Sequence, residues 1–311
     1  MTEKLLALCL LMLLPRCTAN AANIDYENGC PTGCHCELTH SGSRFSVTSS
    51  NGRPPVDTEQ FAHQLDTILS SDQIAERLTS LSITYTPLTR VPASVCQLLN
   101  LTSLNLHKNN ITELPDNCFT KLTKLVSCSA DENSIVGLQD GLFDGLQSLV
   151  SLSLSRNKIA FIGLRLFSNS SDLINLRWLD LSYNRLTSLE PWWYYRCILS
   201  NQSSPVNIVL RFNMISNFTN NLNFQFRCGM KRPFGKLDIG ENRIVHLMDV
   251  FSGWNIRVGD SLICLRNMHG PHPRMHLDFS GKYYACDCVD FWFYKLIKSF
   301  VRGDFFGRYT V

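Results

Sequence analysis

The 311-residue sequence lacks long apolar runs after residue 22 and has little excess charge of either sign. A membrane-spanning helix needs about 18 consecutive apolar residues, so we expect no spanning segment after that point. The net charge of +3 is close to neutral, so a nucleic-acid partner is not implied. Charged residues make up only 18% of the chain and apolar residues 44%, which excludes a disordered tail and provides enough apolar side chains for a core.

Motifs that carry catalytic or phosphate-binding chemistry are also missing. The sequence contains no Gly-x-Ser-x-Gly, His-Glu-x-x-His or phosphate-loop pattern, and its acidic residues are too scattered to form an acid–base pair on one element. The only histidine cluster is His269-Gly-Pro-His272-Pro-Arg-Met-His276, in which two prolines preclude a regular helix with metal-ligand spacing. We therefore predict that the protein is not an enzyme and needs no metal or cofactor.

The first 21 residues have the three parts of a secretory signal peptide. Lys4 lies in a short positive start, Leu5 to Leu14 form a ten-residue apolar stretch, and Ala19-Asn20-Ala21 is a small-x-small cleavage pattern. A short membrane anchor is the alternative, but ten apolar residues make only about 15 Å of helix, half the thickness of the hydrocarbon core. We therefore expect the protein to be secreted or to lie on the extracellular side of the cell surface.

Glycosylation sequons and cysteine usage agree with export. Each sequon needs a surface position in a secreted protein, and five are present, at Asn100, Asn110, Asn169, Asn201 and Asn217. Thirteen cysteines are too many for an ordinary cytosolic enzyme and too few for a disulfide miniprotein. Removal of the leader takes Cys9 and Cys17, so the mature chain keeps an odd number and at least one thiol has no partner within it.

A repeat with steps of 23 to 29 residues runs through the middle of the sequence. Each copy follows the pattern apolar-x-x-apolar-x-apolar-x-x-Asn-x-apolar, which we number as positions one to eleven. The copy that starts at Leu101, for example, has Leu104 at position four and Leu106 at position six. A degenerate copy from Leu78 comes first, and six later copies share the asparagine at position nine: Asn109, Asn133, Asn157, Asn184, Asn213 and Asn242.

The pattern has a direct physical interpretation. Positions four and six alternate with polar neighbours, which predicts a short strand with one buried face. One copy cannot bury its apolar side alone, so the copies must stack around one continuous core. The asparagine is too polar to face inward by chance, and we expect its amide to satisfy backbone groups of its own turn and of the neighbouring turn.

The repeat resembles the leucine-rich repeat family. The resemblance implies an α/β solenoid, a leucine-rich repeat horseshoe with a parallel β-sheet on the concave face and irregular or short helical segments on the convex face. It is strongest over residues 78–244 and looser on both sides.

The flanking segments resemble the cysteine caps of extracellular leucine-rich repeat proteins. Cys30-Pro-Thr-Gly-Cys34-His-Cys36 is similar to the N-terminal cap, and the resemblance implies a Cys30–Cys36 disulfide. The usual fourth cysteine position carries Ser49 or Ser50, which leaves the partner of Cys34 open. A zinc site in this Cys-x3-Cys-x-Cys segment is disfavoured in an oxidising compartment. Near the C-terminus, Cys286-Asp-Cys288 resembles the start of a second cap, which in the Toll-type version has two more cysteines, so we interpret the sequence as a fragment or a truncated product.

These features divide the sequence into four expected parts. Residues 1–21 are the signal peptide, and residues 22–77 are the N-terminal cap and an extension with a short helix over Gln60 to Leu69. Residues 78–281 hold about seven or eight repeats with an irregular insertion at 245–273. Residues 282–311 are the start of an incomplete C-terminal cap.

The remaining cysteines are assigned from their repeat positions. Cys197 and Cys228 occupy similar outer positions in adjacent long repeats, which predicts a disulfide between them, with Cys264 as the alternative partner of either. Cys96 and Cys128 fall in apolar columns of the repeat, so we interpret both as unpaired, buried side chains.

The candidate ligand-binding residues follow from the strand geometry. Side chains at positions three, five, seven, eight and ten are expected on the concave side, where the early copies carry small polar residues. The later copies carry aromatic and charged residues, of the types enriched at interaction hot spots. Single exposed apolar residues need no explanation, but several on one stripe indicate a contact surface. These candidates are Trp178, Asp180, Tyr183, Arg185, Arg211, Phe212, Met214 and Arg243.

We therefore expect an extracellular recognition module that binds a protein or another macromolecule. A glycan on Asn110 would direct that ligand toward the later copies. The caps and the long irregular repeats resemble the ectodomain of Toll-like receptor type proteins, which implies innate-immune sensing, with membrane contact only through a continuation beyond Val311. The alternatives are a secreted adhesion or matrix protein and a truncated soluble decoy.

Overall fold

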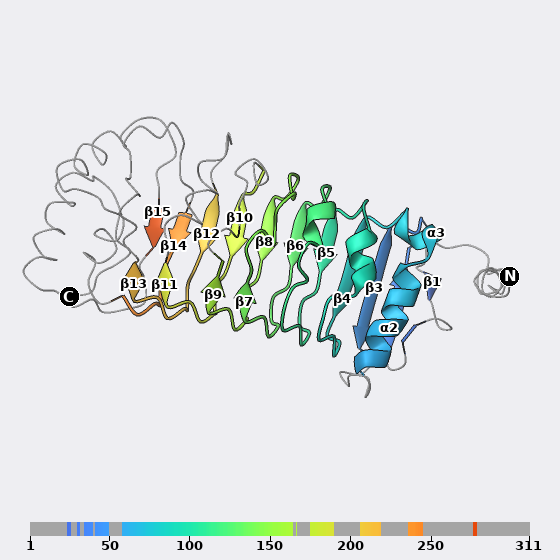
Figure 1. Ribbon diagram of the computed structural model, residues 1–311, viewed down its shortest axis with the longest axis horizontal. Helices are drawn as coiled ribbons and strands as arrows, with labels where there is room; N and C mark the ends of the chain where they lie inside the picture. Colours follow the sequence, from blue (N-terminus) through green and yellow to red (C-terminus); the bar gives the residue numbers. More distant parts are fainter. Residues whose placement is uncertain are drawn as a thin grey trace, which may run out of the picture.

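The computed structural model describes residues 24–25, 30–31, 34–39, 41–49, 58–163, 166, 175–189, 206–218, 236–244 and 276–278. Its main feature is an eleven-stranded sheet that runs along the molecule (Figure 1). In spatial order the strands are β1 (Ile24–Asp25), β2 (Cys34–Leu38), β3 (Arg44–Ser49), β4 (Ser80–Thr84), β5 (Ser103–Asn105), β6 (Ser127–Ser129), β8 (Ser151–Ser153), β10 (Trp178–Asp180), β12 (Asn207–Val209), β14 (Lys236–Asp238) and β15 (His276–Asp278).

The type of strand pairing changes once along this sheet, at β3. β1, β2 and β3 pair antiparallel, whereas every neighbouring pair from β3 onward is parallel. Each copy of the repeat contributes one strand and then returns along the opposite side, so one copy forms one coil of a solenoid (Figure 1). The predicted fold, an α/β solenoid with a parallel sheet, is confirmed.

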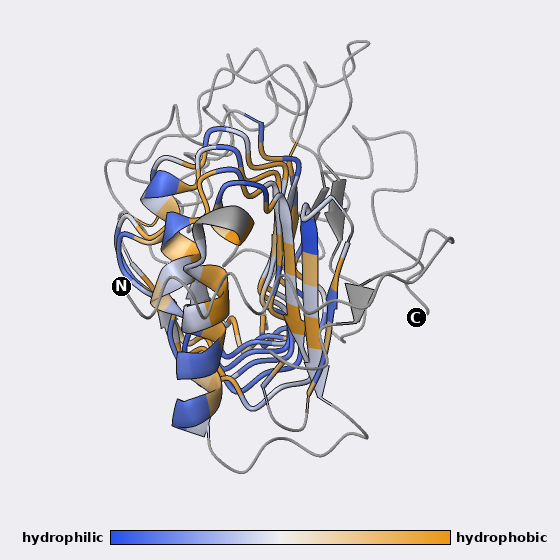
Figure 2. Cartoon of the chain, turned by 90° about the vertical axis from the view of Figure 1, so that its right-hand side faces the viewer, coloured by the Kyte–Doolittle hydropathy of each residue, from blue (hydrophilic) through white to orange (hydrophobic). Residues whose placement is uncertain are grey.

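The side opposite the main sheet is built from short and irregular elements. It includes helix α2 (Thr58–Leu69), α3 (Asp72–Ala75), and the 3-10 turns η2 (Ala93–Gln97) and η3 (Phe119–Lys121). Two small parallel sheets join neighbouring coils, β7 (Gly137–Leu138) with β9 (Phe161–Ile162) and β11 (Ser188–Leu189) with β13 (Asn217–Phe218). Figure 2 shows the helices on one side and the strands on the other, with apolar segments of both turned inward.

The sequence period sets the register of the sheet. Position four of each coil pairs with position four of the next, so Leu81 lies opposite Leu104, and Cys128 lies opposite both Leu104 and Leu152. These residues are almost completely buried, and the interior is a single apolar cluster along the stack. Cys128 is unpaired and buried as expected, and burial raises the pKa of its thiol to about 12, with a smaller contribution from Asp131.

The position-nine asparagines connect consecutive coils through their side-chain amides. Asn157 shows the pattern: Nδ2 donates to the carbonyls of Leu154 in its own coil (3.0 Å) and Ala130 in the preceding coil (2.9 Å). Its Oδ1 accepts from the backbone N–H of Ile135 at 3.0 Å. The same arrangement recurs at Asn133, Asn184, Asn213 and Asn242.

The row of position-nine asparagines begins at the second coil, and the first coil has a threonine at this position. Thr86 occupies position nine, and both its backbone N–H (2.9 Å) and its hydroxyl (2.6 Å) donate to Oδ1 of Asn109. Before this coil lies β3, which belongs to no repeat copy, and the side-chain hydrogen bonds of Thr86 are made to the following coil. Threonine therefore fits here because it needs to satisfy only the following coil.

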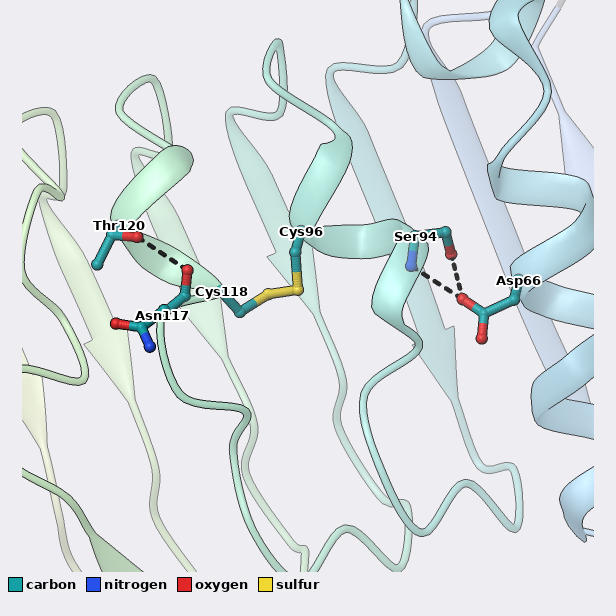
Figure 3. Close-up of a disulfide and its surroundings, with 6 residues drawn as sticks. All are labelled: Asp66, Ser94, Cys96, Asn117, Cys118 and Thr120. Carbon is teal, nitrogen blue, oxygen red and sulfur yellow. Dashed lines mark hydrogen bonds between the residues drawn. A yellow bond between two sulfur atoms is a disulfide. The ribbon is translucent and has the colours of Figure 1, made fainter.

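The N-terminal segment covers the start of the solenoid. The Cys30–Cys36 disulfide is present, and β2 and β3 extend the sheet beyond the first coil. The expected helix at 60–69 is confirmed as α2, which begins two residues earlier at Thr58 and buries Phe61, Leu65 and Leu69. On the same helix, Oδ1 of Asp66 accepts from the N–H (2.9 Å) and hydroxyl (2.7 Å) of Ser94, joining α2 to η2 (Figure 3).

One cysteine assignment was wrong. Cys96 is not an unpaired buried side chain, because it forms a disulfide with Cys118 (Figure 3). The partners are 22 residues apart, almost one repeat, so they lie on adjacent coils with Cα atoms 4.7 Å apart. The column assignment misses this pair because the two cysteines differ by one repeat position, and the irregular turns η2 and η3 bring them together.

Several expected features lie outside the described residues. These are the signal peptide, the sequons at Asn169 and Asn201, most of the histidine cluster, the C-terminal cap, and the five later cysteines Cys197, Cys228, Cys264, Cys286 and Cys288. Among the residues that are described, no helix has the length and apolar character that crossing a membrane requires. The same residues contain no group of three or more side chains able to hold a metal ion.

We predict that the substitution Asn157→Ala lowers the free energy of unfolding by about 3 kcal/mol, because two carbonyls and one N–H lose their partner in a buried site. Asn157→Asp destabilises as well, since a carboxylate still accepts from Ile135 but places lone pairs against both carbonyls. Lys158→Ala, one residue away and exposed, is the control and changes stability by less than about 0.5 kcal/mol. Urea unfolding followed by circular dichroism measures all three, and equal midpoints would contradict the proposed bridging role.

A second prediction concerns the cap. Ser49 lies directly opposite Cys34 in the antiparallel pair of β2 and β3, next to two inward-facing pairs, Cys36 with Val47 and Leu38 with Phe45. Ser49→Cys is expected to form a disulfide with Cys34 and to stabilise the fold by about 3 kcal/mol, the value for a loop of about 15 residues. Ser46→Cys, opposite Glu37 on the other face, is the control. Non-reducing peptide mapping identifies the crosslink, and an unlinked Cys34 in the Ser49→Cys protein would refute the prediction.

Candidate binding surface

The outer face of the sheet changes character at β10. Positions three and five of each strand point away from the core, as the alternating burial of the strands shows. In the four coils before β10 these positions carry only small polar side chains, in register: Ser80, Ser82, Ser103, Asn105, Ser127, Ser129, Ser151 and Ser153. In β10, Trp178 continues the serine row and is 40% exposed, and Asp180 continues the other row. Among positions three and five of the repeat coils, Trp178 is therefore the first bulky side chain.

Position eight, just before the asparagine, has a left-handed backbone in every described coil. Seven non-glycine residues share φ values of 54° to 57°: Tyr85, Lys108, Glu132, Arg156, Tyr183, Phe212 and Glu241. This conformation costs roughly 1–2 kcal/mol for a residue with a Cβ atom. An inter-coil hydrogen bond holds it, for example from the N–H of Tyr183 to the carbonyl of Arg211 at 2.8 Å. Position-eight side chains of neighbouring coils are thereby brought into one row.

The later part of this row is a stack of cationic and aromatic groups. The rings of Tyr183 and Phe212 are stacked, with centroids 4.2 Å apart and planes inclined by 14°. The guanidinium of Arg156 lies 4.2 Å from the centre of the Tyr183 ring, and that of Arg211 lies 5.5 Å from the centre of Phe212. Both aromatic residues remain 39% exposed, so their outer edges are accessible.

In the early part of the row, oppositely charged side chains lie next to each other and form ion pairs. Lys108 Nζ lies 4.9 Å from the centre of the Tyr85 ring and 3.6 Å from Oε2 of Glu132. The Tyr85 hydroxyl, and secondarily the Glu132 carboxylate, hold the pKa of Lys108 above its usual value. His107 also approaches Glu132, at 3.9 Å. These coils leave no cluster of unbalanced charge on this edge among their described residues.

Arg211 differs from the other candidate residues because it is tied into the coil. Its Nη1 lies 3.6 Å from Oδ1 of Asp238, and its Nη2 lies 3.9 Å from Oε1 of Glu241. Asp238 is only 4% exposed, and it also accepts from the N–H of Gly240 at 3.2 Å. Arg211 thus compensates a buried carboxylate, in addition to contacting Phe212.

The eight candidate residues come from three neighbouring coils. Trp178 and Asp180 lie on β10, and the others follow β10, β12 and β14, which are adjacent in the sheet (Figure 1). Asp180 accepts from the N–H of Ser182 at 2.9 Å, while Arg185 and Arg243 are exposed at position ten. Arg156 is not among the candidates predicted from the sequence, although its place at position eight of the preceding coil puts it beside Tyr183. We call Arg156 and the eight candidates the later-coil surface.

A match to a known family model supports the fold over part of the chain. Residues 76–127 and 131–186 match the family model described as leucine rich repeat. A solved leucine-rich repeat protein from Bacteroides eggerthii is 19% identical with a TM-score of 0.47, covering 66% of this chain and 32% of that one. The leucine-rich repeat domain of LRIM1 is 18% identical with a TM-score of 0.45, covering 68% and 65%. The chain thus spans less than two thirds of either protein, and no curated protein matches it by sequence.

We predict that Arg211→Ala destabilises the protein by about 2 kcal/mol, because it removes the cation that faces the buried Asp238. Arg185→Ala removes an exposed cation of the same type from the adjacent coil and is expected to change stability by less than about 0.5 kcal/mol. Thermal and urea unfolding of both variants provide the measurement. Equal stability of the two variants would show that Arg211 has no structural role.

Proposed function

We propose that this leucine-rich repeat protein is an extracellular recognition module that binds a protein through the later-coil surface. Leucine-rich repeat domains are generally protein-binding modules and are typically not enzymes. The observation that carries the proposal is the exposed stack of Tyr183 and Phe212, flanked by two guanidinium groups and close in sequence to Trp178 on the adjoining strand.

The stack is suited to binding because it is already ordered. Immobilising a flexible side chain on binding costs about 0.5–1.5 kcal/mol, and that cost is smaller for rings held against each other and against Arg156. Tyrosine, tryptophan and arginine are also the residue types most enriched at interaction hot spots. A partner that covers the exposed ring edges and Trp178 would bury large apolar groups on a rigid base.

An extracellular location is supported by the covalent chemistry. The described residues contain two disulfides, Cys30–Cys36 and Cys96–Cys118, and disulfides persist mainly in oxidising compartments. The signal-like leader and the five sequons point in the same direction. Asn110 is exposed, and the side chain of Asn100 lies near the surface, contacting the Glu76 carbonyl and Lys124.

The finer role rests on the resemblance of the repeats and caps to Toll-like receptor ectodomains. On that basis we propose a cell-surface receptor of innate-immune type, with a secreted adhesion or matrix protein and a truncated soluble decoy as alternatives. The transcript beyond codon 311 distinguishes them. A membrane span followed by an intracellular domain supports the receptor, a completed cysteine cap followed by a stop codon supports the matrix protein, and an immediate stop codon supports the decoy.

The binding site can be tested without a known partner. Peptides selected from a displayed random library against the intact protein are expected to bind at least about tenfold more weakly to the triple variant Trp178→Ala, Tyr183→Ala, Phe212→Ala. The control is the triple variant Tyr85→Ala, Val136→Ala, Phe161→Ala, which removes large apolar side chains elsewhere that are more exposed than the three tested ones. Arg211 is left intact because its loss is expected to destabilise the protein, and circular dichroism checks that both variants are folded.

The control variant is expected to bind the selected peptides as the unmodified protein does. Peptides that bind both triple variants with unchanged affinity would place the site elsewhere and refute the proposal. Peptides that lose binding to both would show only a non-specific preference for exposed apolar groups, which also contradicts it.

A further inference from the structure

We propose that the later-coil surface recognises an acidic segment of its protein partner, with Arg156, Arg185 and Arg243 binding carboxylates around the Tyr183–Phe212 stack. This inference deepens the proposed function and rests on it, because it specifies the chemistry of the partner at the same surface.

The charge balance of these coils is the first argument. Over residues 149–163, 175–189, 206–218 and 236–244, the described acidic side chains are Asp180, Asp238 and Glu241. Asp180 accepts from Ser182, and the other two face Arg211, so all three are engaged within the protein. The cationic side chains exposed in the same residues are Arg156, Lys158, Arg185 and Arg243. Among the described residues of these coils, the charge left to attract a partner is therefore positive.

The position of the cations is the second argument. Position ten carries Asn110 and Ser134 in the early coils, but Lys158, Arg185 and Arg243 in later ones, with Met214 between the two arginines. Adjacent strands lie about 4.8 Å apart, which places these cations at intervals of roughly 5 and 10 Å along one edge. Same-side residues of an extended chain repeat every ~7 Å, so carboxylates of one segment can reach more than one cation.

Arginine chemistry favours carboxylates at this site. A guanidinium binds a carboxylate with two parallel hydrogen bonds, and it does so best when its plane is fixed in advance. Arg156 is fixed in this way because it lies over the Tyr183 ring. In the early coils, Lys108 already forms a salt bridge with Glu132, so it is less available to a carboxylate of a partner than Arg156 is.

A polypeptide fits the surface better than a nucleic acid or a sulfated polysaccharide. Binding of single-stranded nucleic acid relies on bases stacking on open aromatic faces, but here the faces of Tyr183 and Phe212 cover each other and Arg156 covers part of the first ring. The net charge of the chain is only +3, which is too small for strong general attraction of a polyanion. Trp178 and Met214 add apolar contacts that the side chains of a polypeptide can match.

The test compares two double variants with the same loss of charge. Arg185→Gln with Arg243→Gln removes two cations from the proposed site, whereas Arg90→Gln with Lys121→Gln removes two exposed cations from early coils. The probes are a glutamate-rich peptide containing one leucine, the same peptide with glutamine in place of glutamate, and heparin. Fluorescence anisotropy or calorimetry measures binding at low and high NaCl concentration.

We expect the glutamate peptide to bind the Arg185/Arg243 variant about tenfold more weakly than the unmodified protein, while the control variant binds normally. The glutamine peptide should bind the unmodified protein at least tenfold more weakly, and raising the salt concentration should weaken glutamate binding. Equal binding of the two peptides would overturn the inference. Heparin bound more tightly than the glutamate peptide, with the same dependence on Arg185 and Arg243, would also overturn it in favour of a polysaccharide.

The library selection separates failure of this inference from failure of the proposed function. Selected peptides that require Trp178, Tyr183 and Phe212, but are not enriched in Asp and Glu and tolerate the Arg185/Arg243 variant, would refute the acidic partner while leaving the binding site in place. Peptides that depend on neither set of residues would refute both.

Discussion

The structure depends on one recurring interaction, the bridge that an asparagine amide makes between two coils. A coil of about two dozen residues cannot satisfy the backbone groups of its own turn, because those groups face the neighbouring coil rather than water. Asn157 supplies two donors and one acceptor at this point, and it binds carbonyls on both sides of the boundary. With the turn fixed in this way, the strand before it, the register of the sheet and the apolar interior repeat from coil to coil.

The same bridge explains why an ordered row of side chains, part of the proposed binding surface, forms beside it. The residue before each asparagine must turn sharply, and the described coils place it in the left-handed region without using glycine. The backbone tolerates this cost because the turn is held by hydrogen bonds to both neighbours. The consequence is a row of side chains such as Arg156, Tyr183 and Phe212, presented at nearly constant spacing and able to stack. The order of the surface therefore comes from the same contacts that stabilise the fold.

A structural feature of this protein can be predicted from the sequence alone when it follows the repeat period. Strand positions, sheet register, the burial of Leu104 or Cys128 and the location of the asparagines all follow the period, so they can be derived from the spacing of residues along the chain. The disulfide between Cys96 and Cys118 does not, because its partners sit at different repeat positions and meet only through the irregular turns η2 and η3. The contact of Arg156 with Tyr183 can be predicted only in part. The period places the two residues side by side, but it does not show that the guanidinium lies over the ring.

The arginines of the later coils fall into two groups, those that form ion pairs within the protein and those that stay exposed, according to how far they lie from the strand. Arg211 at position seven is close enough to reach Asp238 on the next strand, so its charge is balanced by a carboxylate of the protein itself. Arg185 and Arg243 at position ten lie beyond the asparagine turn and are exposed. A substitution at position seven therefore alters the coil as well as the surface, whereas one at position ten alters the surface alone. This separation lets a repeat protein change its partner through a few outer positions while the asparagine bridges and the apolar columns keep the fold.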